Sequence, residues 1–449
     1  MRTILILALV APALGAQVAP VPAPALPAGP IVILTDRALD GRGGVLRNAR
    51  IGVAQGKITS LAGPTSSDAM TIDLRGYTVL PGWIDTHVHL DSHFDRTGRI
   101  ATRAETAAEA TLGIANNAWV TLMAGFTTVQ SVGALADAPL RDAIRDHGFP
   151  GPRVLTSLTP IQGDTTLTAD SLRALVRRRK DLGADLIKIF ASKSERVGAG
   201  PTITEEQLRI LCGEAASLGL RTMVHAYRSQ AGAAARAGCR EIEHLTYATQ
   251  ADVDDAVKVG AFISPQVGLV VQNYLENRSR YVGAGGFTDE GMAIMERDLP
   301  RDFEICTLAV HTAGAKVVFS TDATAGAHGR NAEEFLGRVE HCGQTPMAAL
   351  VSANSLAAQA LGLGDRLGSL APGYEADIIA LDGDPVSDLT AVRRVVFVMR
   401  GGVVYKWSGA KGGSTRSRTG RYTGRDAVYP IGRSERSAEA HACRASDHR

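Results

Sequence analysis

Apolar, β-branched runs alternate with helix-forming stretches through the middle of the chain, and this alternation constrains the fold most. Runs such as RVLTSLT, ADLIKIFAS, RTMVHAY and KVVFSTDA are each followed by a segment rich in Ala, Leu, Glu and Arg. Near-continuous apolar strands separated by helical segments indicate a parallel sheet covered on its outer face. With GWIDTHVH there are eight such runs in roughly 270 residues, which predicts an α/β fold with a (β/α)8 TIM barrel over residues 82–365. A doubly wound open sheet is the alternative, but it would normally have fewer strands and a Gly-rich first turn.

The segments on either side of this region are richer in β signals. Residues 30–81 consist of short β segments separated by Gly and Asp turns, and β-rich stretches with Gly-Pro and Gly-Gly turns return at 366–407. We therefore expect the two ends of the chain to meet in one small β-sandwich, of which 30–81 is the first part and 366–407 the second.

The first residues indicate export. Residues 1–16 contain one arginine, then an apolar run, then small residues, which is the layout of a secretory signal peptide. A membrane anchor is the alternative, but the run is short for a bilayer span and a Pro/Ala linker follows at 17–29. We expect cleavage near Ala16, no stable membrane span afterwards, and a periplasmic or secreted protein.

The last residues, 408–449, form a basic tail. They contain nine Lys or Arg, four Asp or Glu and few apolar anchors, which favours disorder. A basic arm that touches a surface is the alternative. The whole chain is nearly neutral, with a formal net charge of +2 over 449 residues, so we expect no nucleic-acid partner.

The cysteines are few and scattered. No C-x-x-C pair occurs among them, so no zinc knuckle is predicted. The five are Cys212, Cys239, Cys306, Cys342 and Cys443. One or two disulfides could form in an oxidising compartment, but an odd number of cysteines in apolar surroundings favours buried thiols.

The stretch GWIDTHVHLDSHFD contains three histidines that are not equivalent. His87 and His89 are two apart on a predicted strand, so their side chains point to the same face about 6.5 Å apart. Two imidazoles at the C-terminal end of a barrel strand can share a divalent cation, and barrel enzymes place their sites at that end. His93 follows the strand in the first βα loop, so we expect it at the rim, in reach of substrate.

Four later strands also carry ligand-type residues. Lys188 lies inside an apolar strand, where an ammonium needs a partner or a chemical change such as carbamylation by CO2; a lysine that snorkels to the barrel mouth is the simpler alternative. His225 and His244 end the next two strands, as ligands or as core histidines. Asp322 follows a buried strand, where it would bind a cation or cap a helix. The order of these residues along the chain is the stronger signal of a metal site. Predicted barrel strands one, four, five, six and eight each end in a residue of this set.

From about residue 30 to 407 the chain resembles the amidohydrolase superfamily. The resemblance rests on PGWIDTHVHL, GADLIKIF, VHAY, AGCREIEHL, STDATAGAHGRNAEEF and LGSLAPGYEADIIALDGDP. It is especially similar to the branch of Xaa-Pro dipeptidases, Xaa-Arg/Lys carboxypeptidases and ochratoxin-type amidases. The resemblance implies two Zn²⁺ or other divalent ions, with a bridging Lys188 carboxylated by CO2. The implied ligands are His87, His89 and Asp322 on the more buried metal, and His225 and His244 on the other.

The same resemblance implies a mechanism. Two metal ions would lower the pKa of a bridging water towards 7 and present hydroxide to the amide carbonyl, with Asp322 as base and then acid. Tyr227 is a candidate for stabilising the oxyanion, or else an interfacial aromatic residue. His328, Arg330 and Asn331 are candidate substrate contacts, Arg330 for a carboxylate, unless the loop serves only to start the next helix. The stretch LTSLTPIQGD lacks the histidine that relatives often carry at strand three, so substrate alignment is expected to differ from theirs.

These observations predict a metal-dependent hydrolase whose small-molecule substrates are dipeptides or N-acyl amino acids. We expect the protein to form a homo-oligomer. Lactones, cyclic amides or organophosphates are the alternative substrates, because the same metal centre supports their hydrolysis. A non-catalytic scaffold is a third possibility, but it should have lost ligands, and all six candidates are present.

Overall fold

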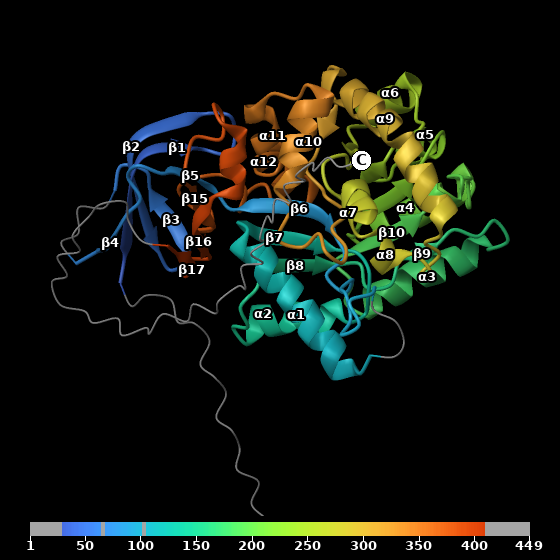
Figure 1. The fold of residues 1–449 in the computed structure, drawn as a ribbon, viewed down its shortest axis with the longest axis horizontal. Helices are drawn as coiled ribbons and strands as arrows, with labels where there is room; N and C mark the ends of the chain where they lie inside the picture. Colours follow the sequence, from blue (N-terminus) through green and yellow to red (C-terminus); the bar gives the residue numbers. More distant parts are fainter. Residues whose placement is uncertain (1–28, 64–67, 101–104, 409–449) are drawn as a thin grey trace, which may run out of the picture. The chain divides into compact units, whose positions relative to one another are not determined.

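A computed structural model describes residues 29–63, 68–100 and 105–408 (Figure 1). The predicted signal peptide at 1–16, all but the last residue of the linker at 17–29, and all but the first residue of the basic tail lie outside the described residues. Among the described helices, none combines the length and the apolar character that crossing a bilayer requires.

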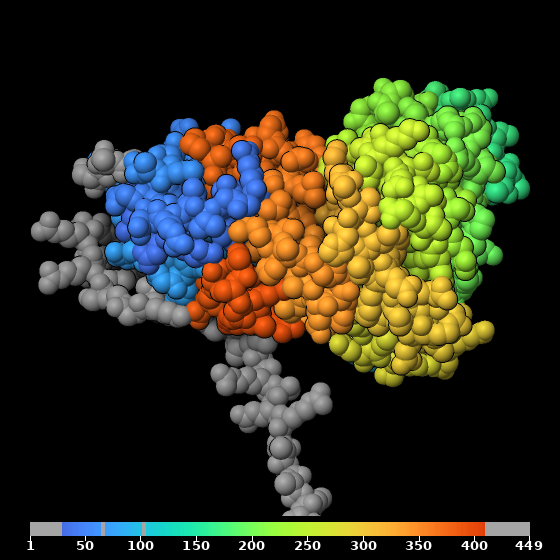
Figure 2. Space-filling view, turned by 90° about the horizontal axis from the view of Figure 1, so that it is seen from above, coloured from blue at the N-terminus to red at the C-terminus, as the bar shows by residue number. Residues whose placement is uncertain are grey.

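Strands from both ends of the described chain form one sheet of eight strands. The hydrogen-bonded order is β17-β16-β15-β5-β1-β2-β3, and β4 pairs with β1. The two ends meet where β5 runs antiparallel to β15, with Leu80 opposite Ile379, and Figure 2 shows blue and red residues packed side by side. The strands are β1 (Ile31–Leu39), β2 (Val45–Ala54), β3 (Lys57–Ser60), β4 (Met70–Asp73), β5 (Thr78–Pro81), β15 (Ile378–Leu381), β16 (Val395–Arg400) and β17 (Val403–Trp407).

The middle of the chain forms parallel strands. One group contains β6 (Trp83–Val88), β7 (Phe126–Ser131) and β8 (Arg153–Thr156), and the other contains β9 (Ile161–Gln162), β10 (Leu186–Phe190), β11 (Arg221–Ala226), β12 (Glu241–His244), β13 (Phe262–Ser264) and β14 (Lys316–Val317). Backbone hydrogen bonds connect the two groups at two places, one between β6 and the segment after β14 and one between β8 and the residue before β10. Thr86 N–H donates to Phe319 O at 3.2 Å, and Asp185 N–H donates to Thr156 O at 2.8 Å. The C-terminal ends of these strands therefore lie together.

Helices connect and cover the parallel strands, as the alternating pattern predicts for an α/β fold. Several begin at a threonine whose side chain caps the first turn, as Thr106 and Thr204 do. They are α1 (Ala107–Met123), α2 (Asp137–Asp146), α3 (Ala169–Asp181), α4 (Glu205–Ser217), α5 (Gln230–Arg236), α6 (Gln250–Val259), α7 (Val270–Glu276), α8 (Arg278–Tyr281), α9 (Asp289–His311), α10 (Glu333–Cys342), α11 (Pro346–Ser352) and α12 (Ser355–Ala360), with short 3-10 turns η1 (Glu195–Val197) and η2 (Leu389–Arg393).

The two faces of β10 explain how the core and the site share one strand. Ile187 and Ile189 pack outward in a core cluster with Leu208 and Leu211 of α4. Lys188 lies between them and therefore points to the opposite face. The apolar residues fix the strand against its helix, and they hold the lysine on the inner side.

The favoured expectation of buried thiols is wrong for four of the five cysteines, and the alternative of one or two disulfides is confirmed. Cys212 of α4 is bonded to Cys239, which lies before β12, and Cys306 of α9 is bonded to Cys342 of α10. The partners are 27 and 36 residues apart in sequence, so only the packing of the helices shows which thiols meet. Cys443 lies outside the described residues.

Candidate metal centre and active site

All six predicted metal ligands line one cavity. Its volume is about 260 Å³, and its wall includes His87, His89, Lys188, His225, His244 and Asp322, together with Tyr227. These side chains come from β6, β10, β11 and β12, and from the segments that follow them or β14. Parallel strands bring them together because their C-terminal ends lie at one edge.

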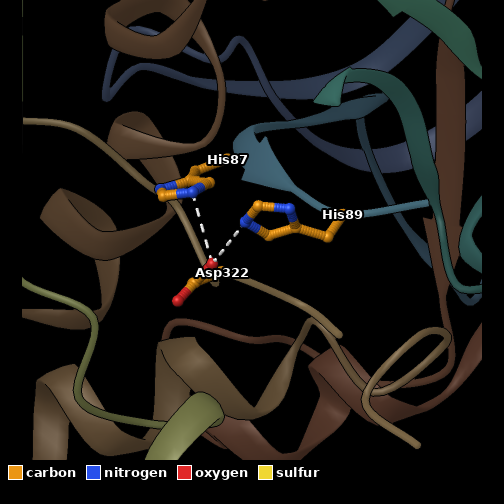
Figure 3. A group of neighbouring side chains, drawn as sticks. All are labelled: His87, His89 and Asp322. Carbon is orange, nitrogen blue, oxygen red and sulfur yellow. Dashed lines mark ion pairs between the residues drawn. The ribbon is translucent and has the colours of Figure 1, made fainter. Parts of the chain in front are cut away.

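The tightest group consists of His87, His89 and Asp322 (Figure 3). Asp322 Oδ1 lies 3.2 Å from His87 Nε2 and 3.0 Å from His89 Nε2, and one atom of each residue can be chosen so that all lie within 4.8 Å of one another. Burial opposes ionisation of Asp322, but the neighbouring imidazoles outweigh it and hold the pKa of its carboxyl well below the usual range. The group therefore offers two nitrogens and one carboxylate to a cation.

His225 and His244 form the second half of the centre. Their ring centroids are 4.4 Å apart, and burial lowers the pKa of both well below the usual value, so both imidazoles are neutral near pH 7. His225 Nε2 is buried and has no hydrogen-bond partner in the described part of the chain. A buried nitrogen without a partner is costly in an empty pocket, and a metal ion would use its lone pair.

Backbone strain coincides with two of these positions. His244 has φ +74° and Asp322 has φ +51°, both in the left-handed region that side chains with a Cβ rarely adopt. The surrounding structure fixes Asp322, whose N–H donates to His87 O at 2.8 Å. Such strain persists only where neighbouring contacts impose it, and it concentrates at functional sites.

Lys188 is fully enclosed instead of reaching the cavity mouth. It is 1 % exposed, its Nζ lies 3.2 Å from His87 Nε2, and no acid forms an ion pair with it among the described residues. Burial lowers the pKa of its ammonium, although Glu243 and Asp322 act in the opposite direction. A buried amine with a lowered pKa is a better nucleophile, which suits reaction with CO2.

Sequence reasoning missed the acid that orients His87. Glu243 Oε2 accepts from His87 Nδ1 at 2.9 Å and from Ser320 Oγ at 3.0 Å, and Gln266 Nε2 also donates to it. This contact directs His87 Nε2 to the cavity side, where Lys188 Nζ and Asp322 Oδ1 lie, as outer carboxylates do for metal-binding histidines. The available signal was the EIEH stretch, where acids alternate along a buried strand.

Glu243→Gln is expected to weaken zinc binding about 10- to 100-fold, because the neutral amide holds His87 less well and makes its Nε2 a poorer ligand. Zinc titration of the metal-free protein by calorimetry measures the effect. Glu340→Gln, at an exposed position on α10, is the matched control. Equal zinc affinity in both variants and the wild type would contradict the role assigned to Glu243.

The four predicted substrate contacts are not among the residues that line the cavity. His93 is buried between Asp91 O and Glu105 Oε2, each 2.8 Å from a ring nitrogen. The other three bind protein groups: His328 Nε2 donates to His89 O at 3.0 Å, Arg330 pairs with Glu276 at 2.7 Å, and Asn331 Nδ2 donates to Asp85 Oδ2 at 2.8 Å. The loop after Asp322 turns back onto β6, so His328 and Asn331 support the metal-side strands.

Other polar residues occupy the cavity wall in their place. Glu195 and Arg196 come from η1 and Asp302 comes from α9, while Tyr274 and Phe287 supply aromatic surface. No sequence motif marks these positions, because η1 and α9 meet only in the folded chain. Tyr227 also lines the cavity, with its ring 4.8 Å from that of His225 and 5.2 Å from that of His244. Burial raises its pKa well above the usual value, so its hydroxyl stays a donor.

Comparisons with known proteins place the chain in a family. Residues 78–405 match the family model described as the amidohydrolase family. The chain is 26% identical over 433 residues to ochratoxinase from Aspergillus niger, covering 84% of this chain and 87% of that one. A crystal structure of a Xaa-Pro dipeptidase with methionine in its active site superposes with a TM-score of 0.76 at 27% identity, covering 84% and 100% of the two chains. A crystal structure of a prolidase complexed with N-methylphosphonate-L-proline superposes with a TM-score of 0.74 at 25% identity, covering 84% of this chain and 100% of that one.

Proposed function

The chain belongs to the amidohydrolase family and is a hydrolase of C–N bonds, and from this premise we propose that it cleaves dipeptides or N-acyl amino acids with two divalent metal ions. The observation that carries the proposal is the convergence of six ligand-type side chains on one cavity. The dipeptidase and prolidase likenesses support the choice of substrate, since a dipeptide and an N-acyl amino acid share an amide next to a carboxylate.

The residues present fit two metal ions. His87, His89 and Asp322 would hold the first, and His225 and His244 would hold the second, using the unpartnered His225 Nε2. Lys188, once carboxylated by CO2, would add negative charge between them. Bound zinc ions would lower the pKa of a water to about 7 and polarise the amide carbonyl.

The chain's own residues would move the protons. Asp322 is ionised and sits at the cavity wall, so its carboxylate would accept a proton from the attacking water and deliver it to the leaving nitrogen. Tyr227 would donate its hydroxyl proton in a hydrogen bond to the oxyanion. Glu243 would keep His87 in one orientation throughout.

We propose Arg196 for the role that the sequence suggested for Arg330. Among the described residues it is the guanidinium that lines the cavity. It stacks over Phe287, with Cζ 4.2 Å from the ring centroid, and its Nη1 donates to Ser194 Oγ at 2.9 Å, but no acid pairs with it there. Its remaining N–H groups would bind the substrate carboxylate.

Arg196→Gln is expected to raise KM about 10- to 100-fold for substrates with a free carboxylate and to leave kcat nearly unchanged, because a charge-assisted hydrogen bond is lost. Steady-state kinetics on each substrate and its methylamide measure the change, and the methylamide should be unaffected. Arg330→Gln is the control. An equal KM increase for both substrates would argue against carboxylate binding.

Metal removal tests the function itself. Protein stripped by a chelator should lose activity on a panel of dipeptides and N-acyl amino acids and regain it with zinc, binding about two equivalents. Lactones, cyclic amides and organophosphates are assayed in parallel, and faster turnover of one of these would favour that alternative. No turnover of any substrate with zinc restored would favour a non-catalytic scaffold.

We further propose that the parallel strands close into a (β/α)8 barrel and that the eight-stranded sheet belongs to a β-sandwich. The hydrogen bonds of Thr86 and Asp185 support closure, since they join the strand groups on both sides. A crystal structure tests both statements: an open edge beside β6 would contradict the barrel, and a single-layered sheet would contradict the sandwich.

We also propose that the protein is exported and forms a homo-oligomer. The two disulfides support export, because disulfides persist in oxidising compartments. Mature protein from the periplasm or medium should begin after Ala16, and light scattering should give a mass above that of one chain. Cytoplasmic retention with reduced thiols, or a monomeric mass, would contradict these expectations.

A further inference from the structure

We propose that Glu195 and Asp302 bind a primary ammonium group of the substrate, so that the enzyme selects a cationic amide over its neutral isostere. The inference deepens the proposed function and rests on it, because it names the substrate class for the same cavity. It depends on the position, burial and missing partners of these two carboxyls.

The two acids lie in the cavity wall and are almost fully buried. Glu195 is 4 % exposed and Asp302 is 5 % exposed, and both line the cavity that holds the metal-ligand side chains. Contact between η1 and α9 brings them to the same side. Glu195 Oε1 is buried with no hydrogen-bond partner among the described residues, whereas Asp302 Oδ1 accepts from Thr246 Oγ1 at 2.5 Å. The cavity wall therefore contains a buried carboxyl oxygen, Glu195 Oε1, that accepts no hydrogen bond from the described residues.

No cation of the described chain forms an ion pair with either acid, although the charge of Arg297 lowers the pKa of Glu195. Arg196 follows Glu195 directly but stacks on Phe287, and Arg297 pairs with Asp298 at 2.8 Å instead of with Asp302. Burial, reinforced by the charge of Asp302, raises the pKa of Glu195 to about 9, and burial raises the pKa of Asp302 to about 7. A bound cation would relieve this electrostatic cost, because an opposite charge favours the ionised carboxylate.

An ammonium fits the unused acceptors. It carries three N–H donors and no acceptor, so it can donate to the unpartnered Glu195 Oε1 and to other carboxylate oxygens of the same wall. Two parts of a dipeptide carry such a group: the free α-amino terminus and the side chain of a lysine residue. The chemistry is the same for both, and the experiment separates them.

Kinetics with matched substrates test the proposal. Dipeptides that differ only as lysine against norleucine, or as free against acetylated α-amine, are compared on zinc-loaded wild type, Glu195→Gln and Asp302→Asn. In wild type the cationic member of one pair should be favoured about tenfold or more in kcat/KM, and each variant should reduce that ratio to near one. The pair that responds identifies the source of the ammonium. Glu304→Gln, exposed on the same helix as Asp302, should keep the wild-type ratio.

A ratio near one in wild type for both pairs, or a ratio unchanged in both variants, would overturn the proposal. If the variants do not fold, inhibition of the wild-type enzyme tests the proposal. The cation n-butylammonium should inhibit hydrolysis of a neutral substrate competitively, and the uncharged 1-butanol should not. If wild type cleaves no amide, the proposed function fails, and calorimetry then tests the cation site separately. Two pairs are compared: L-lysinamide with L-norleucinamide, and L-norleucinamide with its N-acetyl derivative. The cationic member of one pair should bind about tenfold more tightly, and equal affinities within both pairs would overturn the inference.

Discussion

Asp322→Asn is expected to lower kcat about 10²- to 10⁴-fold on the best amide substrate, because asparagine cannot accept the proton of the attacking water. The amide keeps the size of the side chain and its Oδ1 acceptor, so the contacts with His87 and His89 can persist. Steady-state kinetics on samples whose zinc content is measured in parallel separate proton transfer from metal loss.

The controls for Asp322 follow from its position. Asp365→Asn changes an exposed carboxylate and should leave kcat and zinc content unchanged. A variant that keeps two zinc ions but loses activity supports the proton-transfer role. An Asp322→Asn enzyme that retains both zinc ions and most of its activity would contradict it, and another group would then have to carry the proton.

If two zinc ions bind as proposed, Lys188→Ala is expected to reduce bound zinc from about two equivalents to one or fewer. Activity should fall about a thousandfold or more, because the variant lacks the carboxylate proposed to help hold the metal ions. The structural reason is the location of Nζ, which is buried 3.2 Å from His87 Nε2. Metal analysis after gel filtration and kinetics measure the two effects.

Carbon dioxide dependence distinguishes a carboxylated Lys188 from a lysine that only fills space. Metal-free wild type given zinc in CO2-depleted buffer should recover little activity, and added bicarbonate should restore it. Lys188→Ala should not respond to bicarbonate, and Lys258→Ala, exposed on α6, should behave as wild type. Full recovery of wild type without CO2 would contradict carboxylation.

The candidate metal ligands could be located from sequence because they follow local rules. Side chains alternate along a strand, so Lys188 had to face away from Ile187 and Ile189 once those two packed on α4. Parallel strands share one C-terminal edge, so residues that end several strands converge without knowledge of any loop. The structure places His87, Lys188, His225 and Asp322 around one cavity.

The residues proposed to contact substrate follow no such rule. Arg330 looked suitable because it is close to Asp322 in sequence, yet its loop pairs it with Glu276, and Arg196 lines the cavity instead. His93 turns to Glu105 instead of the cavity. A loop side chain points wherever its nearest partners are, and those partners come from distant segments.

The sequence by itself thus determined the alternation of strands and helices and the set of metal-ligand candidates, since both depend on periodicity within single elements. Only the tertiary structure decided the disulfide partners, the orienting contact of Glu243 with His87, and the placement of Glu195 and Asp302 in one cavity wall. Each of these joins elements that are far apart in the chain, and their approach is set by packing of the whole core, which no local pattern records.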